Sequence, residues 1–191
     1  MKNKEITVIA LFGKAGSGKD YLIKSLKNKN IEKVNYKVSC TTRPKREGEK
    51  EGVDYFFLTK EEFLKKKKEG EFVETQEFNG WYYGTRLVDL QEKPKVNIGV
   101  FNISGICQME QAGIDVIPIH IQASDKVRMI RQLEREENPD VAEIVRRFNT
   151  DEEDFSTLPF GSFVFYNEQN DSAEMFESGI VRIMSNLDKF I

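Results

Sequence analysis

A glycine-rich turn near the start of this chain constrains its fold more than any other segment. The turn reads Gly-Lys-Ala-Gly-Ser-Gly-Lys-Asp over residues 13–20, between an apolar run at 6–12 and a stretch with leucine and isoleucine at helical spacing. Glycines let backbone N–H groups curl around an anion, and the start of a helix points partial positive charge at it. Strand, glycine-rich turn, lysine and helix in this order predict a phosphate-binding P-loop. The residues of this predicted site are Gly13, Ala15, Gly16, Ser17, Gly18, Lys19 and Asp20.

The position after the lysine departs from the usual P-loop pattern, which has a serine or threonine hydroxyl there to bind Mg²⁺. This chain has Asp20 instead. A carboxylate oxygen is a hard ligand suited to Mg²⁺, and its charge suits the first turn of a helix. Asp20 is therefore the predicted magnesium ligand, with direct and water-mediated binding both open. The other interpretation is a glycine-rich turn that binds nothing.

The composition limits the class of protein and its partners. Of 191 residues, 39% are hydrophobic and 32% are charged, as in an ordinary folded domain. The net charge of -3 gives no general reason to bind nucleic acid, and no apolar run is long enough to span a bilayer. Cys40 and Cys107 do not have the spacing of a metal motif. We therefore expect a cytoplasmic protein without a nucleic-acid or membrane partner.

The single histidine, His120, lies in an apolar run that reads as a buried strand. A histidine packed in a strand is the expected interpretation, and it argues against catalysis by a histidine triad or a histidine-metal cluster.

Strand-like and helix-like segments alternate along the chain, which predicts an α/β fold. A capping box at 59–62 opens one helix, and Asn79-Gly80 is a two-residue hairpin turn. Strands are expected at 6–12, 36–40, 54–58, 72–78, 81–83, 96–102, 116–121 and 163–166. Helices are expected after residue 19, from 59 to about 70, and at 125–137, 140–154 and 173–191, with Ser124 as a cap.

Four further segments follow the P-loop in a fixed order. They read Ser-Cys-Thr-Thr-Arg-Pro-Lys-Arg-Glu-Gly-Glu at 39–49, Gly-Val-Asp-Tyr-Phe-Phe at 52–57, Gly-Glu-Phe-Val-Glu at 70–74 and Tyr-Tyr-Gly-Thr at 82–85. In order and spacing they resemble the signatures of guanylate kinases, over most of the chain. Four ordered motifs are more specific than a P-loop, which many unrelated nucleotide-binding proteins share.

The resemblance implies a P-loop kinase core with a mostly parallel sheet flanked by helices, a β-rich monophosphate-binding insert and a helical lid. It implies a single domain with its core at 1–40, 87–130 and 155–191, its insert at 41–86 and its lid at about 131–154. The implied reaction is transfer of the γ-phosphoryl group of MgATP to GMP or dGMP, so the implied co-substrate and cofactor are ATP and Mg²⁺.

The resemblance implies an acceptor site formed by Ser39, Arg43, Arg46, Glu49, Tyr55, Glu74, Tyr83, Thr85 and Asn102. The residue chemistry agrees, because guanidinium forks and tyrosine hydroxyls bind phosphate oxygens. A carboxylate at position 74 accepts from the N1–H and the 2-amino group of guanine, which adenine lacks. Taken alone, the two arginines would be read as a solvated loop, and Glu74 as a residue on the solvent face of a hairpin.

Phosphoryl transfer requires positioning and charge neutralisation. Arg131 and Arg135 are expected one turn apart on one helix face, and Arg147 follows the Asn-Pro break at 138–139. By resemblance these three arginines and Lys19 are the catalytic cations, while Asn167 lies near the adenine of ATP. Salt bridging within helices is the other interpretation, and it is the favoured one for Arg128.

The chain also departs from the family pattern. Guanylate kinases usually carry Asp-Ile-Asp where this chain has Asn102 and Ser104, so Asp20 is a candidate for the missing metal-site charge. A lysine-aspartate ending to the P-loop resembles phage-type deoxynucleoside monophosphate kinases. A broader deoxynucleotide range and a non-catalytic binding module both stay open, and a monomer and a homodimer are equally compatible with the sequence.

Overall fold

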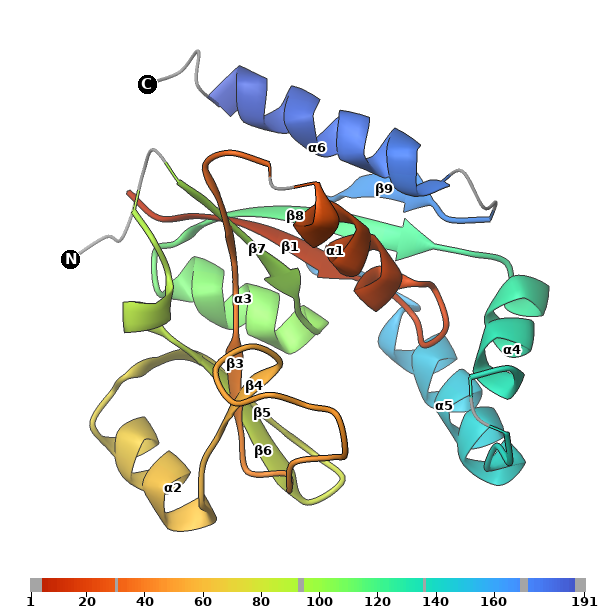
Figure 1. Cartoon of the computed structure of the whole chain (residues 1–191), viewed down its shortest axis with the longest axis horizontal. Coiled ribbons are helices and arrows are strands. Elements are labelled where there is room, and N and C mark those ends of the chain that lie inside the picture. The colour runs from red at the N-terminus through yellow and green to blue at the C-terminus, as the bar shows by residue number, and fades with distance from the viewer. Residues whose placement is uncertain (1–4, 30, 93–94, 136, 169–171, 188–191) are drawn as a thin grey trace. The chain divides into compact units, whose positions relative to one another are not determined.

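The structure is a computed structural model, which describes residues 5–29, 31–92, 95–135, 137–168 and 172–187 (Figure 1). The chain divides into two compact units. The first comprises Met1–Ala10 and Lys33–Val116, and the second comprises Leu11–Glu32 and Ile117–Ile191. In the part of the chain that is described, no helix combines the length and the apolar character needed to cross a membrane.

A five-stranded sheet has the strand order β2-β7-β1-β8-β9. Its strands are β1 (Thr7–Phe12), β2 (Val34–Tyr36), β7 (Val96–Val100), β8 (Asp115–Gln122) and β9 (Phe163–Tyr166). The first unit contains β2, β7 and the beginnings of β1 and β8, and its core includes the fully buried Val8 and Ile9. β2 pairs with β7 in parallel, as the predicted mostly parallel sheet requires.

A second, four-stranded sheet lies wholly in the first unit, with the order β4-β3-β6-β5. Its strands are β3 (Ser39–Thr41), β4 (Tyr55–Phe57), β5 (Phe72–Phe78) and β6 (Trp81–Arg86). The helix α2 (Lys60–Lys68) packs on this sheet through Phe63, whose ring is stacked 4.4 Å from that of Phe72 and 5.5 Å from that of Tyr82. β4, β5, β6 and α2 fall within the segment 41–86 that was predicted to be β-rich, whereas β3 begins before it, at Ser39.

Local signals in this sheet behave as predicted. Thr59 and Glu62 form both hydrogen bonds of a capping box. The turn between β5 and β6 has positive φ at Asn79 (50°) and Gly80 (76°), the geometry that a tight hairpin requires. These elements were predicted because their signals lie within a few residues of each other.

One predicted strand of the first unit is wrong. The run 36–40 is divided between β2 and β3, which belong to different sheets. The chain leaves the first sheet at Lys37, whose backbone N–H still donates to Ile98 O at 2.9 Å. The apolar pattern of the run does not reveal this change of partner.

The helix α3 (Ile103–Gln111) was not predicted. It begins at Asn102, whose Oδ1 accepts a hydrogen bond from the Gly105 backbone at 2.7 Å. Asparagine is a favourable N-cap, so the cap was the local signal for this helix. A glycine and a serine in its first turns weaken its intrinsic helix propensity.

The second unit contains the P-loop, the remainders of β1 and β8, and β9. Its helices are α1 (Lys19–Asn28), α4 (Asp125–Leu133), α5 (Val141–Asp154) and α6 (Ser172–Leu187). α1 and α6 are joined by an ion pair between Lys29 and Glu177 at 3.4 Å, and α4 and α5 lie side by side (Figure 1). The predicted end of the last helix, at 188–191, lies outside the described residues.

His120 is packed in β8, as predicted. Its ring is stacked 4.8 Å from Phe12 and 5.3 Å from Phe155. Burial, with a smaller contribution from Lys14 and Lys19, lowers the pKa of His120 below its usual value. The ring therefore acts as a neutral aromatic packing group.

The helix α4 is shorter than predicted. It ends at Leu133 with Glu134 as its C-cap, so Arg135 lies beyond the helix and not one turn from Arg131 on the same helix face. The physical reason is the acidic residues after 133, because negative charge is unfavourable at the negative end of the helix dipole. The predicted extension to 137 is therefore wrong.

The first unit places a lysine among apolar neighbours. Lys37 Nζ donates to Val100 O at 3.1 Å and lies 3.8 Å from the centre of the Phe101 ring. Its stem lies so close to Gly99 that a Cβ there would be 2.9 Å from Lys37 Cε. Burial lowers the pKa of Lys37 from 10.5 to about 8, against the opposing effects of Glu74 and Cys40.

We expect Lys37→Met to raise the free energy of unfolding at pH 7 by ~1–3 kcal/mol, because it removes the cost of burying an ammonium group. Below the folded-state pKa of about 8, both states carry the proton and the full cost is present. Between about 8 and 10.5 the folded state releases its proton first, so the advantage of the variant should shrink. Urea unfolding at pH 7 and at about pH 9.5 measures both effects. The exposed Lys45→Met is the control, and a less stable Lys37→Met at pH 7 would contradict the analysis.

Candidate functional site

The P-loop in the second unit has the backbone shape that its glycines allow. φ is positive at Gly16 (77°) and Gly18 (89°). A Cβ on Gly16 would lie 2.6 Å from Arg128 O, and one on Gly18 would lie 2.2 Å from Asn167 Nδ2. Glycine is therefore required at both positions for two reasons, the positive φ and the lack of space for a Cβ.

The side chain of Lys19 folds back over the loop that precedes it. Its Nζ donates to Gly13 O at 2.7 Å and to Lys14 O at 3.0 Å. Burial lowers the pKa of Lys19, and the nearby carboxylates of Asp20 and Asp151 oppose that change. Its Nζ also lies 3.4 Å from Ser17 Oγ. The lysine is thus held by neutral oxygens of the loop, which it can exchange for the charged oxygens of a phosphate.

Asp20 is exposed in the first turn of α1, directly after Lys19. In the described part of the chain, no three His, Cys, Asp or Glu side chains are grouped so that they could hold a metal ion. Mg²⁺ does not need such a group, because it commonly binds one or two carboxylates together with substrate phosphates and waters. A single exposed carboxylate beside a phosphate-binding loop fits that chemistry.

Asn167, directly after β9, is only 1% exposed. Its Nδ2 donates to Ser17 O at 2.7 Å, and its backbone N–H donates to Gln122 O at 2.7 Å. Its Oδ1 is buried and has no hydrogen-bond partner among the residues that the structure describes. A buried acceptor without a donor is costly, so this atom is suited to receive an N–H group of a ligand.

Ser124 does not cap α4 with its side chain, contrary to the prediction. Its hydroxyl donates to Glu168 Oε2 at 2.9 Å, and its backbone N–H also donates to the Glu168 carboxylate. This charge-assisted hydrogen bond orients the Ser124 hydroxyl toward Glu168, and the hydroxyl oxygen accepts no backbone N–H of the first turn of α4.

The predicted catalytic arginines have different surroundings. Arg131 Nη1 is 3.5 Å from Ser17 O of the P-loop. Arg147 Nε donates to Glu143 Oε1 at 2.8 Å, and Arg146 pairs with the same carboxylate at 2.6 Å. Hydrogen bonds from Arg146 and Arg147 lower the pKa of Glu143 to about 2. Arg135 is exposed beyond the end of α4.

Arg128 contacts the P-loop directly, a contact that sequence reasoning missed. Its Nε donates to Ala15 O at 3.0 Å and its Nη2 donates to Asp151 Oδ2 at 2.7 Å. The same oxygen of Asp151 accepts the Ala15 N–H at 2.7 Å. The sequence shows an arginine and an acidic run far apart, and only the packing of α4 against α5 relates them.

The four-stranded sheet of the first unit gathers most of the predicted acceptor residues on one face. Ser39 is opposite Tyr55, Thr41 is opposite Tyr83, and Glu74 is opposite Thr85. Paired residues point to the same side of a sheet, as do residues two apart on one strand. This side is opposite to the one that Phe63 of α2 covers.

At one end of this face the predicted phosphate ligands cluster around Glu49. Arg43 Nη2 donates to Glu49 Oε1 at 2.6 Å, and the backbone N–H of Arg46 donates to Glu49 Oε2 at 2.8 Å. The Arg43 guanidinium also lies 5.5 Å from the Tyr55 ring. The hydrogen bond from Arg43 is the main cause of the lowered pKa of Glu49.

At the other end of the face, Glu74 is only 5% exposed, so its interpretation as a solvent-facing hairpin residue is wrong. Thr85 Oγ1 donates to Glu74 Oε1 at 2.5 Å. The second oxygen, Oε2, faces the first turn of α3, where a Cβ on Gly105 would lie 3.2 Å from it. Asn102 caps that helix and donates to the Gln76 side chain.

Gln108 is a further residue of this region that sequence reasoning missed. Its Oε1 accepts the Thr75 N–H at 3.0 Å and its Nε2 donates to Thr75 O at 3.1 Å. These two hydrogen bonds hold β5 against α3, next to Glu74. An amide on an unpredicted helix gives no sequence signal.

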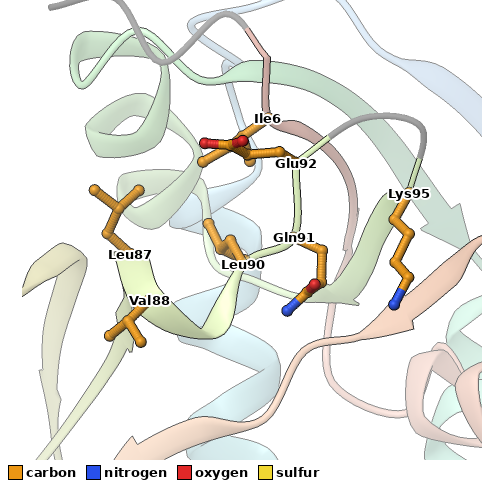
Figure 2. Close-up of a pocket in the computed structure, with 7 residues that line it drawn as sticks. All are labelled: Ile6, Leu87, Val88, Leu90, Gln91, Glu92 and Lys95. Carbon is orange, nitrogen blue, oxygen red and sulfur yellow. The ribbon is translucent and has the colours of Figure 1, made fainter.

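A hollow of about 560 Å³ lies elsewhere in the first unit (Figure 2). It is lined by Ile6, Leu87, Val88, Leu90, Gln91, Glu92 and Lys95. None of these is a predicted site residue, and they do not converge on a common polar group in Figure 2. The chemistry-bearing groups are therefore those of the P-loop and of the sheet face.

Comparison with known proteins supplies the family. A family model described as guanylate kinase matches residues 5–181. A guanylate kinase of Streptococcus agalactiae serotype III is 32% identical over 167 residues, which are 85% of this chain and 79% of the relative. A guanylate kinase of Schizosaccharomyces pombe is 42% identical over 110 residues, 56% of this chain and 54% of the relative.

A guanylate kinase of Shouchella clausii is 39% identical over 131 residues, which are 68% of this chain and 56% of the relative. The segments matched in the S. pombe and S. clausii relatives therefore span only about half of each relative's length. The crystal structure of a guanylate kinase from Anaplasma phagocytophilum aligns over 96% of this chain and 87% of that chain, with a TM-score of 0.64 and 24% identity. That similarity shows the fold. The match of the family model over nearly the whole sequence, with the S. agalactiae relative, shows that this chain belongs to the guanylate kinase family.

Proposed function

We propose that this chain catalyses transfer of the γ-phosphoryl group of MgATP to GMP or dGMP, which gives ADP and the corresponding diphosphate. The observation that carries the proposal is the buried Glu74 carboxylate, paired with Thr85 on the sheet face that also bears Tyr83 and Tyr55. A base-reading carboxylate and a phosphate-binding cluster on one face match the two ends of a guanine nucleotide.

The second unit would hold the donor nucleotide. In the proposal the N–H groups of the P-loop after Ala15, whose own N–H is bonded to Asp151, cradle the phosphates of ATP. Lys19 leaves its loop oxygens to neutralise their charge. Asp20 would hold Mg²⁺, which neutralises phosphate charge when bound. The unpartnered Oδ1 of Asn167 supports a role for this residue as acceptor for the amino group of adenine.

The first unit would hold the acceptor. Arg43, Arg46, Tyr55 and Tyr83 bind the monophosphate in this proposal, together with Ser39. Glu49 orients Arg43 through the 2.6 Å ion pair, and Arg43 keeps further guanidinium N–H groups for phosphate oxygens. Thr85 and Asn102 add polar groups around the base.

Glu74 would read the base. Its two oxygens accept from the N1–H and the 2-amino group of guanine. Adenine offers neither donor, so it would leave a buried carboxylate without partners. Such a mismatch gives strong discrimination between bases.

The reaction needs no general base from the protein. An oxygen of the acceptor phosphate attacks the γ-phosphorus, and the bond to the bridging oxygen of the leaving ADP breaks. Arg131, Arg135 and Arg147 would stabilise the charge that spreads over the transferred group. Arg147 would have to exchange Glu143 for phosphate, which is feasible because the ion pair is on the surface.

The substrate range tests the proposal first. We expect ADP release from MgATP to depend on GMP or dGMP and to be negligible with AMP, dTMP or dCMP, measured in a coupled assay. Turnover of all deoxynucleotides would instead indicate a broader kinase and remove the base-reading role of Glu74. Inactive but folded protein that binds GMP and not MgATP would indicate a binding module.

We expect Glu74→Gln to raise the KM for GMP and dGMP by ~10–100-fold, because the amide presents a donor where guanine also presents donors. The KM for MgATP should not change. Steady-state kinetics with each substrate varied in turn makes the comparison. Glu77→Gln is the matched control, since Glu77 is an exposed residue of the same strand. An unchanged KM for GMP in Glu74→Gln would contradict the assignment.

We expect Asp20→Ala to raise the Mg²⁺ concentration needed for half-maximal rate, by about tenfold, because one carboxylate ligand is lost. Asp20→Ser should show a change in the same direction, since a hydroxyl restores a ligand but not the charge. Initial rates across a Mg²⁺ titration measure this, with the exposed Glu32→Ala as control. Identical titrations for all variants and the parent would exclude Asp20 as the metal ligand.

A further inference from the structure

Two charged side chains hold the Ala15 segment of the P-loop from two helices of the second unit. Asp151, on α5, accepts the Ala15 N–H at 2.7 Å. Arg128, on α4, donates to Ala15 O at 3.0 Å. The two side chains are also joined to each other at 2.7 Å, so loop, α4 and α5 form one closed ring of hydrogen bonds.

Arg128 is built into this position. It is only 1% exposed, and its guanidinium lies 4.3 Å from the centre of the Phe148 ring. Its Nη1 donates to Asp125 Oδ1 at 2.7 Å, so each of its three nitrogens has a partner. The backbone of Arg128 also abuts Gly16, where a Cβ would clash with its carbonyl oxygen.

A buried ion pair is weak evidence for stability, because desolvation offsets the attraction. Its position is more informative than its energy. The pair is at the apex of a glycine-rich loop, and an ordered loop of this composition loses much conformational entropy. Lys14 of the loop forms a further ion pair with α5, to Glu152, but this pair is exposed.

We propose that Arg128 and Asp151 are positioning residues that hold the P-loop in its phosphate-binding shape and fix it to α4 and α5. The inference rests on the proposed function, since it assigns the loop to MgATP. In this arrangement the N–H of Ala15 is used to shape the loop, which leaves the later N–H groups of the loop for phosphate. The same contacts set α4 against the loop, and α4 carries Arg131, whose Nη1 is 3.5 Å from Ser17 O.

The proposal predicts a specific loss of affinity for the donor nucleotide. In Asp151→Ala and in Arg128→Met the loop would have to be ordered at the moment of binding, so that affinity for MgATP should fall about tenfold. Affinity for GMP should not change, because the contacts belong to the second unit alone. Arg128→Lys should not restore MgATP affinity, since one ammonium cannot reproduce a guanidinium that serves three partners. The double variant should lose no more than the worse single variant, because both residues support one arrangement.

Calorimetric titration of the whole protein with MgATP and separately with GMP tests this, with thermal unfolding recorded for each variant. Asp154→Ala is the matched control, because Asp154 is an exposed carboxylate on the same helix. If Asp151→Ala does not fold, Asp151→Asn keeps an acceptor for Ala15 and weakens the ion pair, and a fall in MgATP affinity of about threefold or more is then expected.

The outcomes separate the inference from the proposed function. Loss of MgATP affinity with GMP affinity retained supports the positioning role. A lower melting temperature with unchanged MgATP affinity in the variants would overturn it, since the pair would then be structural only. A parent protein that fails to bind MgATP would overturn the proposed function itself, and the inference with it.

Discussion

Close packing against glycine is the constraint on which the second unit depends. Gly16 and Gly18 have positive φ, and neither leaves space for a Cβ beside Arg128 and Asn167. The backbone N–H groups of the loop are thereby gathered at the start of α1, where the helix dipole adds positive charge. Lys19, Asn167 and Arg131 then pack on a loop whose shape is already decided. A Cβ on Gly16 would displace the Arg128 backbone, and one on Gly18 would displace the Asn167 amide.

The main constraint in the first unit is a buried carboxylate, Glu74, that accepts a hydrogen bond from the neighbouring Thr85 hydroxyl. Glu74 is placed by strand pairing with Thr85 and by the amide of Gln108, which fixes the neighbouring Thr75 on α3. Asn102 contributes at the same place by capping α3. Its side-chain N–H also donates to Gln76, which the aspartate of the family pattern could not do, whereas either residue could cap the helix. The unit therefore presents these polar side chains on a sheet and a helix start, which are a more exact support for recognition than a loop.

Several features could be read from the sequence because their signals are local. The P-loop, the capping box at Thr59 and the Asn79-Gly80 hairpin each depend on residues within one or two turns of chain. The errors have equally specific reasons. Acidic residues end α4 before Arg135. The Ser124 hydroxyl donates to the Glu168 carboxylate and does not cap α4. The helix α3 was missed because its sequence is poor in helix-forming residues. In each case a short-range pattern was overridden by electrostatics or tertiary packing.

The sequence by itself determined the family motifs, the alternating α/β pattern and the chemical types of the site residues, since these follow from spacing and composition. Tertiary structure alone decided that Arg128 meets Asp151 at the P-loop and that Glu74 is buried. Both results depend on contacts between segments far apart in the chain. A hydrophobic or charge pattern encodes which face of an element is apolar, but not which distant partner covers it. These charged side chains lose their contact with water only when their partners pack against them, and only then is an unpaired charge costly.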